Sequence, residues 1–375
     1  MQNATLLWHV SLLAPDEQKA LALGGLGFAR FVPVVALSLL GGLATDAWDR
    51  RRLMLATQIG AAAVAAGLAV MTWHGMTLPA LYSLAALGAA FGAFDVPARQ
   101  ALVPTLVPRE DLPGAISLNA FVIQAASVGG PALGGLLIVS NGVGWAYMVN
   151  ALSYGFVIGA VLLMRSMPGP ADHRRAALSW DAVIEGFRFA MRTPVIRATL
   201  LLDFFGTFFS AARSLLPIFA QDVLLVGPVG YGWLYAGPAI GAVATSALMV
   251  PLVTRVTHRG RVLVGAVTMY GAATVAFGAS RWFWLAFVCL VLTGVADAVA
   301  IVLRNTIRQL ETPDHLRGRL SAVSMLVFQG SPRLGDVQAG ALAYWIGAPA
   351  AVIAGGIGCL AATQWVAART SALKD

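Results

Sequence analysis

We single out six ionisable side chains that stand well inside long apolar runs of the sequence, where little water is available to solvate a charge. They are Arg30, Asp203, Arg213, Asp297, Arg333 and Asp336. On membrane-insertion scales a buried charge costs at least about 2.5–3.5 kcal/mol, so each of these residues is a candidate for function. A carboxylate in such a place can take up and release a proton. The alternative is a static buried ion pair that fixes the register of two helices.

A short charged motif, made of Gly42, Asp46, Arg50 and Arg51, follows one apolar run. Gly42 allows another helix to approach closely, and Asp46 can pair with arginines. Such a cluster can hold one face of a protein closed in one state and release it in another. The plainer alternative is that the successive arginines only orient the chain in a membrane.

A second motif, made of Gly130, Pro131, Gly134 and Gly135, lies inside an apolar run. Proline bends a helix and frees a carbonyl group, and glycines let a facing helix come close. The motif therefore predicts a bent helix with a tight contact. A generic packing face, as found in many glycine-rich spans, is the alternative.

The composition indicates that these residues belong to a membrane protein. Of 375 residues, 58% are hydrophobic and 11% are charged, whereas a soluble domain carries about 25% charged residues. The net charge of +8 does not indicate nucleic acid, because the cations fall in short breaks between apolar runs. The sequence offers neither a phosphate-binding glycine loop nor a nucleophile–base pair, which argues against ATP-driven transport and against an enzyme. Cys289 and Cys359 both lie in apolar runs, so no disulfide, metal site or cofactor is expected.

Eleven runs are long enough to cross a bilayer as helices, which takes about 20 apolar residues each. They cover 20–45, 53–73, 78–97, 116–139, 143–164, 195–218, 230–251, 261–280, 282–303, 320–345 and 348–368. The apolar stub from Ala4 to Ala14 precedes them and is too short to span. We therefore expect that Met1 is an internal methionine and that the first helix is truncated. A true eleven-span chain with a degenerate first helix is the alternative.

The distribution of lysine and arginine predicts the orientation of the chain. One set of breaks, together with the tail after Ala368, holds 20 of the 25 cations, and the opposite set holds Lys19 and Arg281. Breaks rich in arginine face the cytoplasm. We therefore expect a multi-pass protein of the cell inner membrane with a cytoplasmic carboxyl terminus.

The spacing of similar residues indicates an internal duplication. The matching pairs are Arg99 with Arg304, Gly130 with Gly335, and Gly135 with Gly340. Parallel repeats of this kind are typical of secondary transporters. The predicted division is an amino-terminal helical half at 1–164, a cytoplasmic linker at 165–194 and a carboxy-terminal helical half at 195–375.

The linker contains an amphipathic segment. Its apolar face carries Trp180, Val183, Ile184, Phe187 and Met191. Asp181, Glu185, Arg188 and Arg192 lie on the polar side. This pattern predicts a helix that lies on the inner leaflet of the membrane.

The charged motif at 42–52 resembles the loop between helices two and three of the major facilitator superfamily, although Ala47 and Asp49 depart from its pattern. The motif at 130–135 resembles the G-P-x-x-G-G element of antiporters in that superfamily. Together with 97–104 and 108–112, these segments are similar to the enterobactin-exporter-like branch of drug:proton antiporters. The R-x-x-Q-G element of many such antiporters is absent from 84–94. The resemblance implies two six-helix halves related by pseudo-two-fold symmetry. It also implies that the motif at 130–135 is typical of exporters.

The resemblance implies proton-coupled efflux of a small molecule, siderophore-like or drug-like, by a monomer embedded in the lipid bilayer. In that fold helices seven and ten line the central cavity, which favours Asp203 and Asp297 as proton carriers. Helices two and eleven are neighbours, so Arg30 is expected to meet Asp336. Two alternatives stay open: a flippase for lysophospholipid on the same fold, and a transport-inactive truncated membrane protein.

Overall fold

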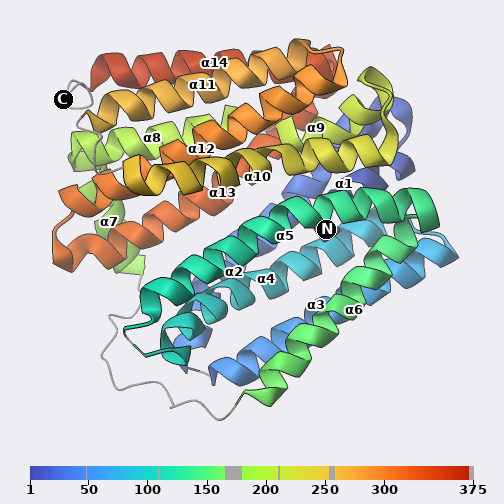
Figure 1. The fold of residues 1–375 in the computed structure, drawn as a ribbon, viewed down its shortest axis with the longest axis horizontal. Helices are drawn as coiled ribbons and strands as arrows, with labels where there is room; N and C mark the ends of the chain where they lie inside the picture. Colours follow the sequence, from blue (N-terminus) through green and yellow to red (C-terminus); the bar gives the residue numbers. More distant parts are fainter. Residues whose placement is uncertain (48, 109, 165–179, 210–211, 253–257, 371–375) are drawn as a thin grey trace. The chain divides into compact units, whose positions relative to one another are not determined.

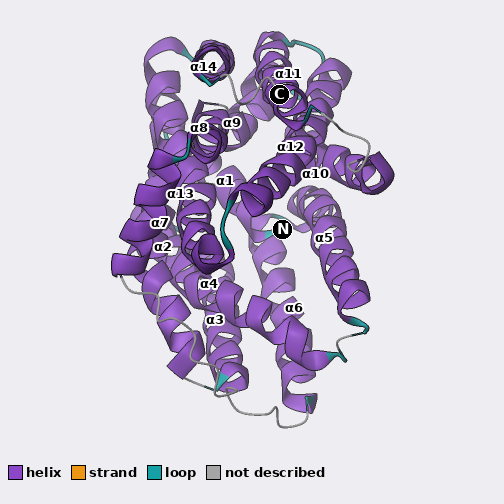
Figure 2. Ribbon diagram, turned by 90° about the vertical axis from the view of Figure 1, so that its left-hand side faces the viewer, coloured by secondary structure: helices purple, strands orange, loops and turns teal. Residues whose placement is uncertain are grey.

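The computed structural model describes the whole chain except residues 48, 109, 165–179, 210–211, 253–257 and 371–375. Within this described part all regular structure is helical, as the colouring in Figure 2 shows. Nine of its helices are long and apolar enough to cross a membrane. The predicted all-α membrane protein is therefore confirmed.

The α-helices of the described part are numbered in chain order. The first six are α1 (Gln2–Leu13), α2 (Lys19–Ala47), α3 (Arg50–His74), α4 (Leu78–Leu106), α5 (Leu112–Asn141) and α6 (Val143–Leu163). The others are α7 (Trp180–Arg192), α8 (Pro194–Phe209), α9 (Ala212–Ile218), α10 (Gly227–Leu252), α11 (Arg259–Ala279), α12 (Phe283–Glu311), α13 (Asp314–Ile346) and α14 (Ala348–Arg369). A 3₁₀ turn at Asp16–Gln18 precedes α2, and a π turn at Phe219–Val223 follows α9.

The chain forms two compact units. The first unit contains Met1–Ala14 and Phe28–Leu178, and the second contains Pro15–Gly27 and Ser179–Asp375. In the first unit α3 packs between α4 and α6 (Figure 1), and α1 contacts α4, α5 and α6. Apolar side chains of α3, α4 and α6 meet in its core: Leu53, Met54, Ala98, Leu102 and Val161.

The second unit is held together by α11, which packs along α12 and α14, and by α8, which contacts α12, α13 and α14. Its core contains Leu202, Leu263, Val267, Leu303 and Cys359, all buried. Glycines bring some of these helices very close. A Cβ atom on Gly356 of α14 would lie 2.9 Å from the nitrogen of Val275 in α11. A Cβ atom on Gly294 of α12 would meet the carbonyl group of Pro238 in α10. Helices without a large hydrophobic driving force between them associate through such small-residue contacts.

Several helices extend beyond their predicted spans, and the extension of α12 past residue 303 matters most for the site. The break expected between Arg304 and Arg319 is reduced to Thr312 and Pro313, because α12 continues to Glu311 and α13 already begins at Asp314. Leu303 and Ile307 are buried and extend the packed face of α12 beyond the apolar run. Arg304 and Arg308 therefore belong to a helix and not to a loop.

We expect Gly294→Leu to destabilise the second unit, because any side chain there meets the backbone of α10 and not a flexible group. Overpacking of this kind costs about 1–3 kcal/mol or more. The matched control is Gly265→Leu in α11, where the space around a Cβ atom is open. The measurement is the unfolding temperature of both purified variants in detergent. Equal stability of the two variants would contradict the close α10–α12 contact.

Candidate functional site

Asp203 of α8 lies between two arginines of α12. Its Oδ1 atom is 2.9 Å from Nη1 of Arg304, and its Oδ2 atom is 3.2 Å from Nη2 of Arg308. The three residues are only 3%, 4% and 8% exposed. Because an unpaired charge at this depth would be strongly unfavourable, these ion pairs fix α8 against α12.

Two further groups complete the cluster. Arg308 donates from Nε to Oγ1 of Thr199 at 3.2 Å and from Nη2 to the carbonyl oxygen of Thr199 at 3.3 Å. Nη2 of Arg304 lies 3.5 Å from Oδ1 of Asp297. The two carboxylates and two guanidinium groups sum to zero charge. The members differ in access: the side chain of Asp297 is 39% exposed and that of Asp203 is 4% exposed.

The spacing of the charges on α12 explains why they meet. Arg304 and Arg308 are one helical turn apart, and Asp297 lies two turns before Arg304, so all three share one face. Leu303 and Ile307 are buried beside that face. Sequence reasoning selected Asp203 and Asp297 but placed both arginines in the break between two predicted spans. The seven- and four-residue spacings were the signal that could have found them.

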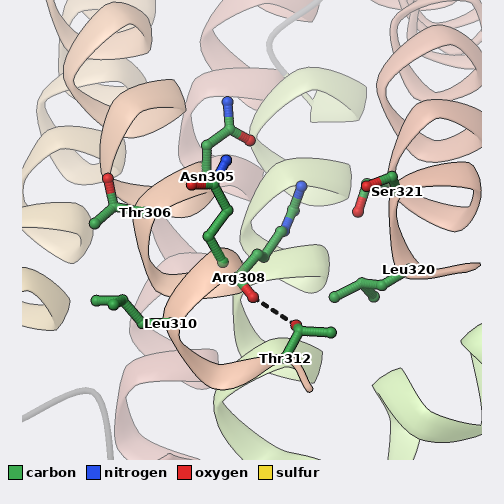
Figure 3. A pocket seen from close by; sticks show the side chains of 9 residues that line it. Asn305, Thr306, Arg308, Leu310, Thr312, Leu320 and Ser321 are labelled. Atoms are coloured by element: carbon green, nitrogen blue, oxygen red, sulfur yellow. Dashed lines mark hydrogen bonds between the residues drawn. The ribbon is translucent and has the colours of Figure 1, made fainter. Parts of the chain in front are cut away.

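A cavity of about 720 Å³ opens where α12 ends and α13 begins. Most of its lining residues are polar and uncharged: Asn305, Thr306, Gln309, Thr312, Ser321 and Ser324, with Arg308, Leu310 and Leu320. Figure 3 labels Asn305, Thr306 and Ser321 among them. Thr312 donates from Oγ1 to the carbonyl oxygen of Arg308 (Figure 3). Arg308 therefore belongs both to the buried charge cluster and to the wall of this cavity.

The first unit contains its own charge pair, which sequence reasoning missed. Asp95 of α4 accepts from Nη2 of Arg99 at 2.7 Å and from Nε2 of Gln58 at 2.7 Å. Thr57 of α3 donates to the same carboxylate at 3.3 Å. An aspartate four residues before an arginine in a helix was the available signal. Arg99 is the residue that the predicted duplication pairs with Arg304.

The charged motif is only partly visible. Gly42 and Asp46 belong to the last turns of α2 and Arg50 begins α3, but the side chains at these positions lie outside the described part of the chain. Arg51 donates from Nε to the carbonyl oxygen of Val161 at 3.0 Å and from Nη2 to that of Leu162 at 2.7 Å. These carbonyls lie in the last turn of α6, where no backbone partner is available. Arg51 thus ties the start of α3 to the end of α6.

The glycine–proline motif lies in α5 and faces α1. A Cβ atom on Gly134 would lie 3.2 Å from Cγ of Met1 and 3.6 Å from Oγ1 of Thr5. Gly135 is buried, and Pro131 lies inside the helix. The predicted close approach of another helix is therefore observed, with α1 as the neighbour.

Of the other four predicted residues, Arg30 belongs to the first unit, and the rest belong to the second unit, where the charge of Arg213 acts on Asp297. Arg30 donates from Nη2 to Oδ1 of Asn3 at 2.8 Å, and Arg213 is exposed on α9. Arg333 donates to the carbonyl oxygen of Gln329 in its own helix, α13. Asp336 lies one turn further along α13, where its Cβ atom would be 2.8 Å from a Cβ atom on Gly27. The pairing of Arg30 with Asp336 stays a prediction.

Comparison with known proteins shows relatives across nearly the whole chain. The model of the family described as transmembrane secretion effector matches residues 8–373. Enterobactin exporters of Shigella boydii serotype 18 and Escherichia coli O1:K1 are each 28% identical over 343 residues, which cover 89% of this chain and 79% of theirs.

Solved transporter structures share the fold. A nucleoside transporter superposes with a TM-score of 0.78 at 10% identity and covers 97% of this chain and 94% of its own. A bacterial homologue of the human lysosomal transporter Spinster, inward-facing and occupied, gives a TM-score of 0.71 at 14% identity and covers 98% of this chain and 96% of its own. These neighbours confirm the predicted all-α transporter fold, and the two six-helix halves stay a prediction.

Asp203→Asn is expected to destabilise the second unit by about 3–5 kcal/mol, because it leaves Arg304 and Arg308 buried without their common carboxylate. Asp297→Asn should cost less, since its side chain is partly exposed and its only ion pair in the described chain is long. Unfolding temperatures in detergent test the difference. A double variant, Asp203→Asn with Arg308→Met, should recover part of the loss. If Asp297→Asn were the more damaging change, the cluster would not depend on Asp203.

Gly134→Val is expected to push α1 away from α5, because the new side chain needs space that Met1 and Thr5 occupy. Gly129→Val in the same helix is the matched control, since a Cβ atom there meets no neighbour within 4 Å. Cross-linking yield between cysteines introduced in α1 and α5 measures the contact. A similar yield in both variants would show that the motif does not serve α1.

Proposed function

The chain belongs to the transmembrane secretion effector family of the major facilitator superfamily, and from this premise we propose that it exports a small molecule in exchange for protons by alternating access. The resemblance predicted from 42–52 and 130–135 is confirmed by that membership. The protein is a multi-pass membrane transporter and not an enzyme. The cargo, the proton coupling and the alternating access are the proposal.

The relatives support export of a small molecule. They are named enterobactin exporters and match this chain over 89% of its length. The proposed cargo is accordingly a siderophore-like or drug-like molecule. We place the protein in the inner membrane. Its carboxyl terminus is proposed to be cytoplasmic, because the tail belongs to the arginine-rich set of segments. We propose that it works as a monomer.

The observation that carries the proton coupling is the electrically neutral cluster of two carboxylates and two arginines. Protonation of Asp203 would break two ion pairs at 2.9 and 3.2 Å. Protonation of Asp297 would break one pair, at 3.5 Å, and its side chain is accessible. Asp297 is therefore the proposed proton carrier, and Asp203 is the fixed partner that holds both arginines.

A proton on Asp297 would change the balance of the cluster. Arg304 would lose its second carboxylate and the cluster would carry a net positive charge. A state of the protein that brings water or another anion to Arg304 would then be favoured. Proton uptake would in this way shift the equilibrium between inward-open and outward-open states, as an energetic coupling requires.

The proposal is tested by Asp297→Asn in proteoliposomes that carry the full chain. A pH gradient should accelerate efflux of the cargo by wild type, measured with a panel of siderophores and lipophilic cations. In the variant the acceleration should fall by about 5- to 150-fold, the usual range of coupling free energies. Exchange of cargo without a gradient should persist.

Asp16→Asn is the matched control, because Asp16 is a surface carboxylate whose side chain is 91% exposed. It should leave the gradient effect unchanged. An unaltered gradient effect in Asp297→Asn would remove this residue from the coupling. If the protein translocates a fluorescent lysophospholipid but exports none of the siderophores or lipophilic cations tested, export of small polar or drug-like cargo is contradicted.

A further inference from the structure

We propose that α7 and the first turn of α8 form a docking surface for the anionic phospholipids of the membrane. Five exposed residues make up this surface: Ile184, Phe187, Arg188, Arg192 and Arg197. The inference concerns lipid recognition and does not depend on which cargo the protein exports.

One face of α7 is anchored to α13. Gly186 is buried, and a Cβ atom there would lie 2.6 Å from the carbonyl oxygen of Arg319. Ala190, one turn later, is fully buried. Glu185 forms an ion pair with Arg319. Because the backbone of α7 lies directly on α13, the orientation of its opposite face is fixed.

The opposite face exposes large apolar side chains. Ile184 is 50% exposed and Phe187 is 54% exposed, and they are three residues apart on the same side of the helix. Exposed apolar groups on a short helix beside a membrane span are typical of interfacial helices, which bury such side chains at the boundary of headgroups and acyl chains. A soluble polyanion would give these two residues no apolar partner.

Three arginines surround that apolar pair. Arg188 and Arg192 are one turn apart and both exposed. Arg197 is brought to the same place, because its Nη1 atom lies 3.5 Å from the carbonyl oxygen of Met191. Glu185, on the same side of α7, forms its ion pair with Arg319 of α13. Near a membrane surface each arginine raises the affinity for acidic lipid by roughly fivefold.

The connectivity places this surface where a span leaves the bilayer. Thr193 joins the two helices without a loop: its nitrogen donates to the carbonyl oxygen of Phe189, and its carbonyl oxygen accepts from the nitrogen of Arg197. α8 then begins a candidate membrane span at Pro194. Apolar side chains, arginines and the end of a span together fit an acidic lipid headgroup.

The test uses the full chain in nanodiscs of phosphatidylcholine, with or without phosphatidylglycerol. Both native cysteines are buried, so a dye can be attached at Ile184→Cys alone. Energy transfer to headgroup-labelled lipids gives the relative association of phosphatidylglycerol over phosphatidylcholine at this helix. We expect a clear preference for phosphatidylglycerol, lowered about fivefold by Arg192→Gln and about 25-fold by Arg188→Gln with Arg192→Gln.

Arg281→Gln is the matched control, because Arg281 is an exposed arginine in the turn between α11 and α12, at the other end of the helices. It should not change the preference at α7. Equal association of both lipids with wild type would overturn the proposal. So would an equal loss in Arg192→Gln and Arg281→Gln, which would mean that only net charge matters. If soluble polyanions shield the dye at position 184 from the solvent and lipids do not, the surface belongs to another partner.

Discussion

A guanidinium group removed from water must keep a carboxylate within reach, and this requirement organises the second unit. Arg304 and Arg308 are nearly inaccessible, yet both belong to α12. Asp203 satisfies both at once from α8, so the two helices cannot separate without leaving a buried charge unpaired. The close packing of α12 on α10 through Gly294 adds a second restraint on the same helix. The ion pairs thus determine which helix faces which, and glycines determine how closely.

The charge pair of the first unit lies within one helix, and its arginine is half exposed. Arg99, which the predicted duplication pairs with Arg304, forms an ion pair with Asp95 on its own helix. Thr57 and Gln58, two neutral donors of α3, hydrogen-bond to Asp95. Loss of the ion pair between Asp95 and Arg99 would therefore act mainly within α4. In the second unit the corresponding event acts between two helices, which makes that unit the better place for a charge-controlled step.

Helices and candidate groups could be predicted because apolar runs and lone charges are local features of a sequence. Asp203 and Asp297 were selected in this way, and the close approach predicted at Gly134 is observed against α1. The end of α12 could not be predicted, because a hydropathy argument treats Arg304 and Arg308 as charges in contact with water, outside the membrane span. Only the fold shows that Asp203, which lies far earlier in the chain, forms ion pairs with both of them. Asp95 was missed because it lies at the end of a predicted span, close to Arg99 in the sequence. Charged residues are common where a helix leaves the membrane.

Arg308 connects two events that transport must couple. Its guanidinium group contacts Asp203 and Thr199 in the buried cluster, and the residue also lines the cavity at the end of α12. On the proposed mechanism, a proton at Asp297 changes the charge felt by Arg304, and Arg304 shares Asp203 with Arg308. A polar cargo in the cavity would meet the other end of the same chain of contacts. Coupling would then need no long pathway through the protein: one carboxylate with two arginine partners would transmit the change, because any shift of Asp203 toward Arg304 weakens its hold on Arg308.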